Sequence, residues 1–250
     1  MGKMADIDEM MYSCGLGILH PGGIDKTDEM ARKCGVGKDK KVLDIGVGKG
    51  VTPCYLAEKY GCNVVGIDLS EKMLEEARKR ADEKRLANKV SLRRGDAHKL
   101  PFVDETFDVI IIECVTTILD KKKAFSEIYR VLKSDGVVGD LEMIWRKKPS
   151  ENAVKDTFEI WEGFETMTLG EWKGLLEKIG FIDVQIVDFS DMMQDMEQEM
   201  KKELGFKGMM KFAGKLMIHG DLRRAWKEYE RVFKEHKEYI GYGYFIGRKK

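Results

Sequence analysis

The stretch that decides the fold class is residues 42–50, Val42-Leu43-Asp44-Ile45-Gly46-Val47-Gly48-Lys49-Gly50. Its first four residues form a short apolar run that is typical of a buried strand. Three glycines at alternate positions follow, and they allow the backbone to turn tightly and to approach a ligand closely. Residues 52–60 then have the pattern of a helix, with a proline suited to its first turn. A strand, a glycine loop and a helix in this order predict a ligand site at the end of the first strand of an α/β fold.

Strands and helices alternate along the chain beyond this loop. We expect strands at 42–45, 64–67, 90–92, 107–112, 137–141, 184–187 and 242–246. Segments with helical spacing separate most of them, and parallel pairing needs such crossover connections. The pattern therefore predicts a doubly wound, Rossmann-like, mostly parallel seven-stranded sheet with helices on both faces.

The same order predicts how the chain is divided. Residues 1–37 would be an N-terminal arm, with one helix from about Thr27 to Cys34, and residues 38–189 with 239–250 would form the sheet domain. Within that domain, residues 142–167 are expected to be a long connection. Residues 190–238 carry three apolar helical stripes. We expect them to form a helical cap, inserted before the last strand, over the site where the molecule that accepts a transferred group would bind. Its methionines fit a plain core face or a core face that also lines an acceptor pocket.

Composition excludes several classes of protein. Lys plus Arg equals Asp plus Glu, 44 against 44, which disfavours nucleic acid as a partner and leaves room only for a local basic patch. The five cysteines and four histidines show no metal-ligand spacing, so we expect reduced thiols and no metal. No apolar run approaches the roughly 20 residues of a membrane span, and the N-terminus lacks a signal core. We therefore expect a cytoplasmic protein, of an oligomeric state that the sequence leaves open.

Acidic residues stand at the ends of the first three expected strands. Asp44 precedes a Gly-x-Gly-x-Gly loop, whereas dinucleotide sites use Gly-x-Gly-x-x-Gly to accept a pyrophosphate. An acid there would repel a pyrophosphate but suits the ammonium of S-adenosylmethionine. Asp68 ends the second strand, where an acid can accept hydrogen bonds from ribose hydroxyls. Asp96 follows the third strand and could accept a hydrogen bond from an adenine amino group.

These motifs, with Gly66-Ile67-Asp68-Leu69-Ser70, Gly95-Asp96-Ala97, Phe107-Asp108 and Arg130-Val131-Leu132-Lys133, closely resemble class I S-adenosylmethionine-dependent methyltransferases. The resemblance is strongest over residues 38–142 and points to the small-molecule branch that includes quinone and sterol methyltransferases. It implies S-adenosylmethionine as cofactor, with its methionine end at Asp44, Gly46 and Gly48, its ribose at Asp68, and its adenine at Asp96 and Ala97. The predicted cofactor contacts also include Val47, Leu69, Met73 and Glu113. The family usually has a small residue or Cys at the position of Val47, and often Thr or Ser at the position of Lys49.

Methyl transfer needs no catalytic triad or metal, because the sulfonium already activates the methyl group. Two residues could serve as a base for a hydroxyl acceptor, namely Glu113 and His20. Glu113 is equally compatible with a satisfied structural acid, and His20 with a turn formed by the following Pro-Gly-Gly. The sequence thus predicts methyl transfer to a small, partly apolar molecule. A methyltransferase acting on tRNA or protein, a non-catalytic cofactor-binding partner module and a dehydrogenase are the alternatives.

Overall fold

The computed structural model describes residues 3–18, 20–161, 163–194 and 196–250. In chain order the elements are α1 (Lys3–Cys14), α2 (Gly23–Lys33), β1 (Lys41–Ile45), α3 (Val51–Tyr60), β2 (Asn63–Asp68), α4 (Glu71–Glu83), β3 (Val90–Arg94), β4 (Phe107–Glu113), η1 (Thr116–Ile118), α5 (Lys121–Val131), β5 (Leu132–Trp145), α6 (Glu151–Ile160), α7 (Leu169–Ile179), β6 (Ile182–Asp188), η2 (Ser190–Gln194), α8 (Met196–Ile218), α9 (Gly220–Glu235) and β7 (Ile240–Arg248). None of the helices within these ranges is long and apolar enough to cross a membrane.

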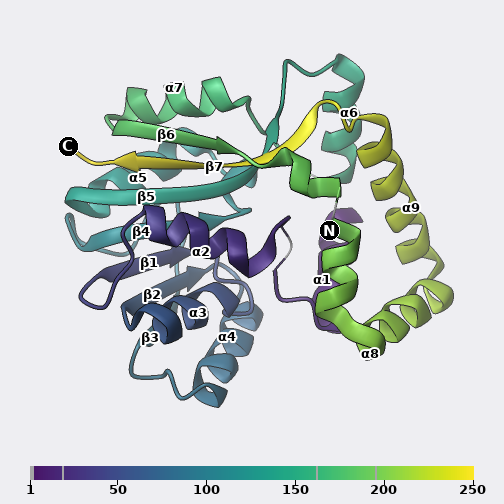
Figure 1. The fold of residues 1–250 in the computed structure, drawn as a ribbon, viewed down its shortest axis with the longest axis horizontal. Coiled ribbons are helices and arrows are strands. Elements are labelled where there is room, and N and C mark those ends of the chain that lie inside the picture. The colour runs from purple at the N-terminus through teal and green to yellow at the C-terminus, as the bar shows by residue number, and fades with distance from the viewer. Residues whose placement is uncertain (1–2, 19, 162, 195) are drawn as a thin grey trace. The chain divides into compact units, whose positions relative to one another are not determined.

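The seven strands form one sheet in the order β3-β2-β1-β4-β5-β7-β6. The strand pairs from β3 to β5 are parallel, with Asp44 of β1 aligned to Gly66 of β2 and to Ile111 of β4. Figure 1 shows helices on both faces of the sheet, and the arrows of β6 and β7 point in opposite directions. The predicted fold class is confirmed: the sheet is doubly wound and mostly parallel, and the helical insertion precedes its last strand.

Two helices were missed by the sequence analysis. Helix α1 lies in the N-terminal arm, ahead of the one helix expected there, although Ile7, Met10, Met11 and Cys14 form a buried stripe at helical spacing. Helix α6 lies in the segment expected to be a connection, and its inner face is made of Ala153, Thr157 and Ile160. Because that face is narrow and includes a polar residue, the sequence shows only a weak helical repeat of apolar residues there.

Contacts divide the chain into two compact units. The sheet unit comprises 24–142, 170–187 and 243–250, and the helical unit comprises 1–23, 143–169 and 188–242. The helical unit therefore gathers three segments that are far apart in the sequence. The separate prediction of an arm, a sheet domain and a cap at 190–238 stays a prediction.

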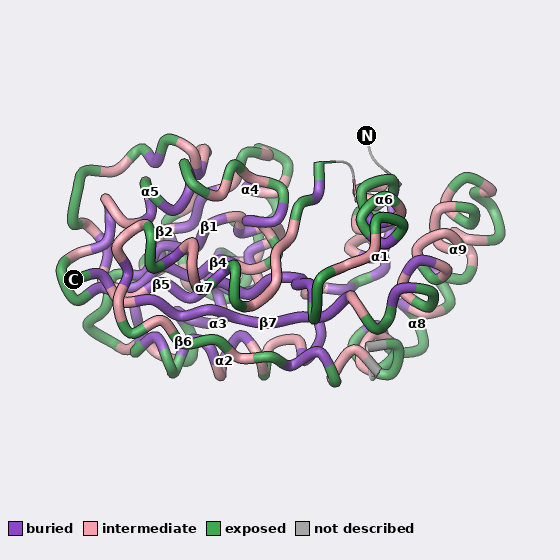
Figure 2. The backbone as a smooth tube through the Cα atoms, turned by 90° about the horizontal axis from the view of Figure 1, so that it is seen from above, coloured by how far each residue is buried: buried purple, intermediate pink, exposed green. Residues whose placement is uncertain are grey.

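Aromatic packing holds the C-terminal part of the sheet unit together. Trp172 of α7 stacks on Phe245 of β7 at a centroid distance of 5.0 Å and meets Phe125 of α5 edge-on at 6.2 Å. All three side chains are fully buried, and the tube of β4 and β5 is buried along much of its length (Figure 2). Burying rings of this size contributes about 1.5–3 kcal/mol each. This core fixes the sheet whose opposite half carries the glycine loop.

Aromatic rings also form the centre of the helical unit. Tyr229 and Phe233 of α9 pack against Trp161 at centroid distances of 6.0 and 5.5 Å. Phe212 of α8 meets Trp226 of α9 edge-on at 5.0 Å. Helix α8 changes direction at Gly205, whose φ and ψ of 58° and −173° are not helical. The two halves of α8 can therefore follow different directions.

Glycines stand at both ends of α3, and their surroundings differ. Gly50 before the helix has a φ of 74°, and a Cβ there would lie 2.8 Å from Cβ and 2.9 Å from Cα of Ala77 in α4. Gly61 after the helix has a similar φ of 68°, but the nearest atom to a Cβ would be Lys38 Cγ at 3.7 Å. Only Gly50 is therefore required both by its left-handed backbone and by the close approach of a second helix.

This pair gives a matched test of the packing at the glycine loop. We expect Gly61→Ala to cost about 1 kcal/mol, because only the left-handed conformation is strained. Gly50→Ala should cost about 2–4 kcal/mol, since displacing α4 adds an overpacking penalty of about 1–3 kcal/mol. Urea denaturation of the two variants measures the difference. Equal losses would contradict a tight contact between the loop and α4.

Candidate cofactor-binding site

The glycine loop is fixed from three sides. The amides of Gly46 and Val47 donate hydrogen bonds to the carbonyl of Ile67 in β2, at 2.8 and 3.1 Å. A Cβ at Gly46, whose φ is 80°, would lie 2.3 Å from Cγ2 of Val115 beyond β4. The side chain of Val47 is buried against Leu74 of α4. These contacts thus fix the backbone conformation of the loop. It lies at the carboxyl ends of β1, β2 and β4, where open α/β sheets bind ligands.

Asp68 connects this loop to the start of α4. One carboxylate oxygen accepts a hydrogen bond from the amide of Gly48 at 3.0 Å, and the other from the amide of Ser70 at 2.8 Å. Ser70 in turn caps α4 by accepting from the amide of Met73. Leu69, between Asp68 and Ser70, is 56% exposed. The predicted residues Gly48, Asp68, Leu69 and Met73 therefore lie at one corner of the site, and Asp68 also orders the loop.

Asp44 is the most unusual acid of the site. Its side chain is 2% exposed, and Oδ2 has no hydrogen-bond partner among the described residues. Burial raises the pKa of this carboxyl well above its usual range, and the negative charges of Glu113 and Asp68 raise it further. A buried polar atom without a partner costs free energy unless a ligand satisfies it. Asp44 therefore fits a ligand that brings a cationic hydrogen-bond donor, such as an ammonium group.

Asp96 is held by the loop that follows β3. Its Oδ1 accepts hydrogen bonds from the amide of His98 at 2.8 Å and from His98 Nδ1 at 2.9 Å, and these lower its pKa. The amide of Asp120 donates to His98 Nε2, so Nδ1 carries the proton of this imidazole. Both bonds from His98 use Oδ1, while Ala97 beside it is buried. This arrangement leaves Oδ2 of Asp96 as the oxygen that could accept a hydrogen bond from an adenine amino group.

The two candidate bases are in different units. Glu113 at the end of β4 accepts hydrogen bonds from the hydroxyls of Thr27 and Thr52, at 2.7 and 2.6 Å. These bonds tie α2 and α3 to the end of β4, which favours the structural interpretation of this acid. His20 belongs to the helical unit, is buried, and has Nδ1 3.1 Å from the carbonyl of Pro21. A turn contact of this kind favours the structural interpretation of His20 as well.

Two buried acids near the site were missed by the sequence analysis. Glu142 of β5 accepts hydrogen bonds at 2.6 Å from the amides of Val115 and Thr116, and Asp140 accepts one from the Thr116 hydroxyl at 2.8 Å. Burial raises the pKa of both carboxyls. Glu142 thus positions Val115, the residue that leaves room only for a glycine at position 46. The sequence did contain a signal for these two acids, because they stand two positions apart in the otherwise apolar strand 137–145.

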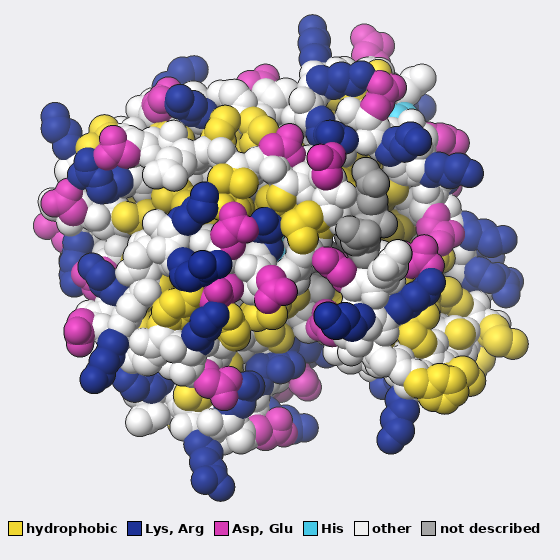
Figure 3. All heavy atoms as spheres, in the orientation of Figure 1, with side chains coloured by type: hydrophobic (Ala, Val, Ile, Leu, Met, Phe, Trp, Pro, Cys, Tyr) yellow, Lys and Arg dark blue, Asp and Glu magenta, His cyan; other side chains and the backbone are white. Residues whose placement is uncertain are grey.

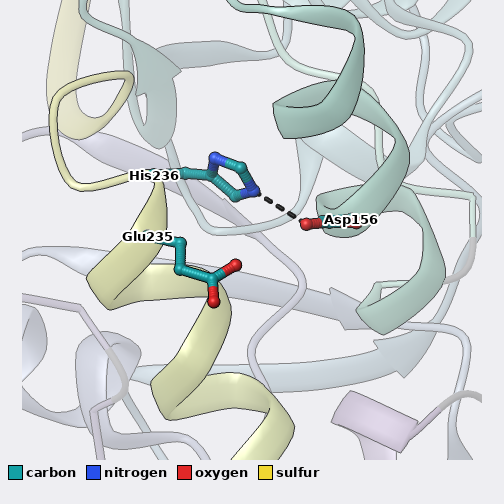
Figure 4. A group of neighbouring side chains, drawn as sticks. All are labelled: Asp156, Glu235 and His236. Atoms are coloured by element: carbon teal, nitrogen blue, oxygen red, sulfur yellow. Dashed lines mark hydrogen bonds and ion pairs between the residues drawn. The ribbon is translucent and has the colours of Figure 1, made fainter.

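The described residues contain one group with potential metal ligands, Asp156, Glu235 and His236 of the helical unit (Figure 4). His236 Nε2 lies 2.8 Å from Asp156 Oδ2. The guanidinium of Arg231 bonds to both Asp156 and Glu235. Since an arginine already occupies both carboxylates, this cluster is an ion-pair network that joins α6 to α9.

The buried carboxyl of Asp44 gives a prediction on stability against pH. Its pKa in the folded protein is raised above the value of 3.8, so the folded state retains a proton that the unfolded state releases. The contribution of this carboxyl to stability without ligand should therefore fall as the pH rises above 3.8. Asp44→Asn removes this loss, so we expect the variant to gain stability relative to the natural protein between pH 4 and pH 8, by about 1.4 kcal/mol for each unit by which the pKa of Asp44 is raised. The difference should vanish in acid.

Asp108 supplies a control of opposite sign. Burial would raise its pKa, but the Lys41 amide and the Lys133 ammonium lower it below the usual range. Asp108→Asn should therefore lose stability at pH 8 and less in acid. Urea denaturation from pH 4 to pH 8 measures both variants. A loss of stability in Asp44→Asn at pH 8, parallel to that of Asp108→Asn, would contradict the prediction.

Comparison with known proteins agrees with this geometry. The family described as "Methyltransferase domain" matches residues 43–139. An uncharacterized methyltransferase of Bacillus subtilis, YodH, is 30% identical over 225 residues, which cover 88% of this chain and 94% of that protein. These matches include the glycine loop, Asp68 and Asp96.

Solved structures show the same fold. A phosphoethanolamine N-methyltransferase 2 of Haemonchus contortus, in complex with phosphomonomethylethanolamine and S-adenosylhomocysteine, has a TM-score of 0.79 at 22% identity. The match covers 93% of this chain and 55% of that one, so this chain spans about half its length. The [4+2]-cyclase SpnF has a TM-score of 0.82 at 22% identity, with 99% of this chain and 95% of that chain covered. Sequence family and fold together show that the chain belongs to the class I S-adenosylmethionine-dependent methyltransferases.

Proposed function

We propose that this protein transfers the methyl group of S-adenosylmethionine to a small, partly apolar acceptor. The observation that carries the proposal is the unpaired, buried Oδ2 of Asp44 directly before the glycine loop. An uncompensated acid at this point disfavours a pyrophosphate and favours the ammonium of the methionine end. The family match supports methyl transfer rather than the other reactions found on this fold.

The residues of the site fit each part of this cofactor. Asp44 would accept a hydrogen bond from the ammonium, and the open backbone at Gly46 and Gly48 would allow close approach of the methionine end. Asp68 would accept hydrogen bonds from the ribose hydroxyls, and Oδ2 of Asp96 from the adenine amino group. Ala97 and the partly exposed Leu69 would contact the base. The predicted contacts of Val47, Met73 and Glu113 rest on their places beside these residues.

In this reaction the protein mainly binds and orients the cofactor and the acceptor. The cofactor supplies a methyl group on a positively charged sulfur, which is a good leaving group. The chain must hold the methionine end in one position and keep water away from it. The buried carboxyls of Asp44 and Glu142 serve the first task, since they fix the ligand and the loop beyond β4 respectively. A soft acceptor would need no base, and Glu113 and His20 stay the proposed bases for a hydroxyl acceptor.

The acceptor is proposed to be a small molecule. The balanced charge of the chain argues against a macromolecular substrate, because tRNA and many protein substrates require a strongly basic or extended docking face. The methyltransferase of known structure described above is named for phosphoethanolamine, a small molecule, which supports a small acceptor here. We propose that residues 190–238 form a cap over the acceptor site. The cytoplasm is the proposed compartment.

Calorimetry tests the cofactor directly. S-Adenosylmethionine and S-adenosylhomocysteine should bind, and NADH should not, because the Asp44 carboxyl opposes a pyrophosphate. Formation of S-adenosylhomocysteine with a panel of small amines, thiols and phenols then tests methyl transfer. Binding of NADH without binding of S-adenosylhomocysteine would overturn the proposal.

A variant of Asp68 tests the ribose contact. Asp68→Ala should weaken S-adenosylhomocysteine binding by about 1.5–3 kcal/mol, which is roughly tenfold or more. The natural protein should also prefer S-adenosylhomocysteine to its 2′-deoxy analogue, and the variant should lose that preference. Asp108→Ala, at the amino ends of the strands, is the control and should leave both affinities unchanged. Weaker binding with an intact preference would restrict Asp68 to ordering the glycine loop.

A further inference from the structure

The second half of α8 presents large apolar side chains to solvent. Phe206, Met210, Met217 and Ile218 are 82%, 59%, 79% and 79% exposed. Positions 206, 210, 213 and 217 lie on one face of a helix, and Ala213 between them is also exposed. Figure 3 shows hydrophobic side chains gathered over this end of α8, next to α9. Soluble surfaces rarely group so many exposed apolar side chains unless they bind something.

The opposite face of the same helix is held by the helical unit. Phe212 is buried and packs against Trp226 of α9, and Leu204 is buried as well. A Cβ at Gly208 would lie 2.8 Å from the carbonyl oxygen of Cys14, so α8 lies close against the end of α1. The exposed stripe is therefore fixed in place and cannot turn inward without breaking these contacts.

Basic residues accompany the stripe. Lys207, Lys211 and Lys215 follow one another at intervals of four residues, and Arg223 and Arg224 lie in the first turns of α9. No acidic residue occurs between Gly205 and Gly220. Within the described ranges, none of these five basic side chains forms an ion pair, although the Lys211 ammonium donates to the Ser13 carbonyl. The patch of residues 206–224 thus combines exposed apolar side chains with five basic residues and one acid, Asp221, in a chain of zero net charge.

We propose that this patch, residues 206–224, docks on the surface of an anionic phospholipid bilayer. An exposed apolar helix face with basic residues on an adjoining face is suited to the boundary between headgroups and acyl chains, where the cations can meet lipid phosphates. A second copy of the chain is a poorer occupant, because a two-fold interface would bring these uncompensated positive charges close together. The inference does not rest on the proposed function.

Sedimentation with lipid vesicles tests the proposal on the full chain. Binding to vesicles of phosphatidylcholine mixed with phosphatidylglycerol should be clear in low salt and should weaken in 0.5 M salt, where the Debye length is only a few ångströms (roughly 4 Å). Binding to pure phosphatidylcholine should be much weaker. Lys207→Glu with Lys215→Glu should lower the partition coefficient by roughly 30-fold or more, given the contribution of each basic residue near a charged surface. Phe206→Ser with Met217→Ser should lower it by at least tenfold (~1.4 kcal/mol).

Matched variants elsewhere on the surface separate this patch from general effects. Lys122→Glu with Lys178→Glu makes the same charge change on exposed positions of α5 and α7, and Val103→Ser removes an apolar side chain that is 78% exposed. Both controls should bind vesicles as the natural protein does. Absent binding, equal binding to neutral vesicles, or equal losses in the controls would overturn the proposal. So would sedimentation velocity showing a dimer that Phe206→Ser with Met217→Ser dissociates.

Discussion

The whole site depends on how closely the loop after β1 is packed. Glycines at positions 46 and 50 take left-handed conformations, and a methyl group at either would meet Val115 or Ala77 at distances well below contact. A Cβ at Gly66 of β2 would likewise lie 2.5 Å from Val47. Three elements therefore close on one loop, and any side chain added there must move a strand or a helix. This tight packing fixes the backbone of the loop, whose amides at Gly46, Val47 and Gly48 donate to Ile67 and Asp68.

Buried carboxyls fix the same region at a cost in stability. Asp44 and Asp140 each have an oxygen without a hydrogen-bond partner in the described part of the chain, and burial raises the pKa of both. Glu142 instead satisfies the amides of the loop beyond β4. Asp44 Oδ2 lacks a hydrogen-bond donor at the place proposed for a ligand ammonium. Glu142 has donors in the loop beyond β4, which its hydrogen bonds hold in place. We therefore propose that Asp44 binds the ligand and that Glu142 positions the loop, although both carboxyls are buried.

The sheet, and the gathering of three acids at one edge of it, could be predicted from the sequence, because their signals are local. A strand followed by Gly-x-Gly-x-Gly, with acids at successive strand ends, places Asp44, Asp68 and Asp96 at one edge of a parallel sheet. The role of Asp68 in ordering the loop could not be predicted, since it depends on the distance between Gly48 and Ser70 in space. The hydroxyls of Thr27 and Thr52 on Glu113 come from distant segments in the same way. Helix α6 escaped prediction because a threonine interrupts its narrow buried face.

We propose that Asp44, Asp68 and Asp96, at the ends of three strands, each bind a different part of one cofactor. A crystal structure with S-adenosylhomocysteine tests it most directly. We predict that the ligand ammonium lies within hydrogen-bond distance of Asp44, both ribose hydroxyls bond to Asp68, and the adenine amino group bonds to Asp96. A ligand bound elsewhere, or one whose ribose leaves Asp68 on the amides of Gly48 and Ser70 alone, would contradict the account.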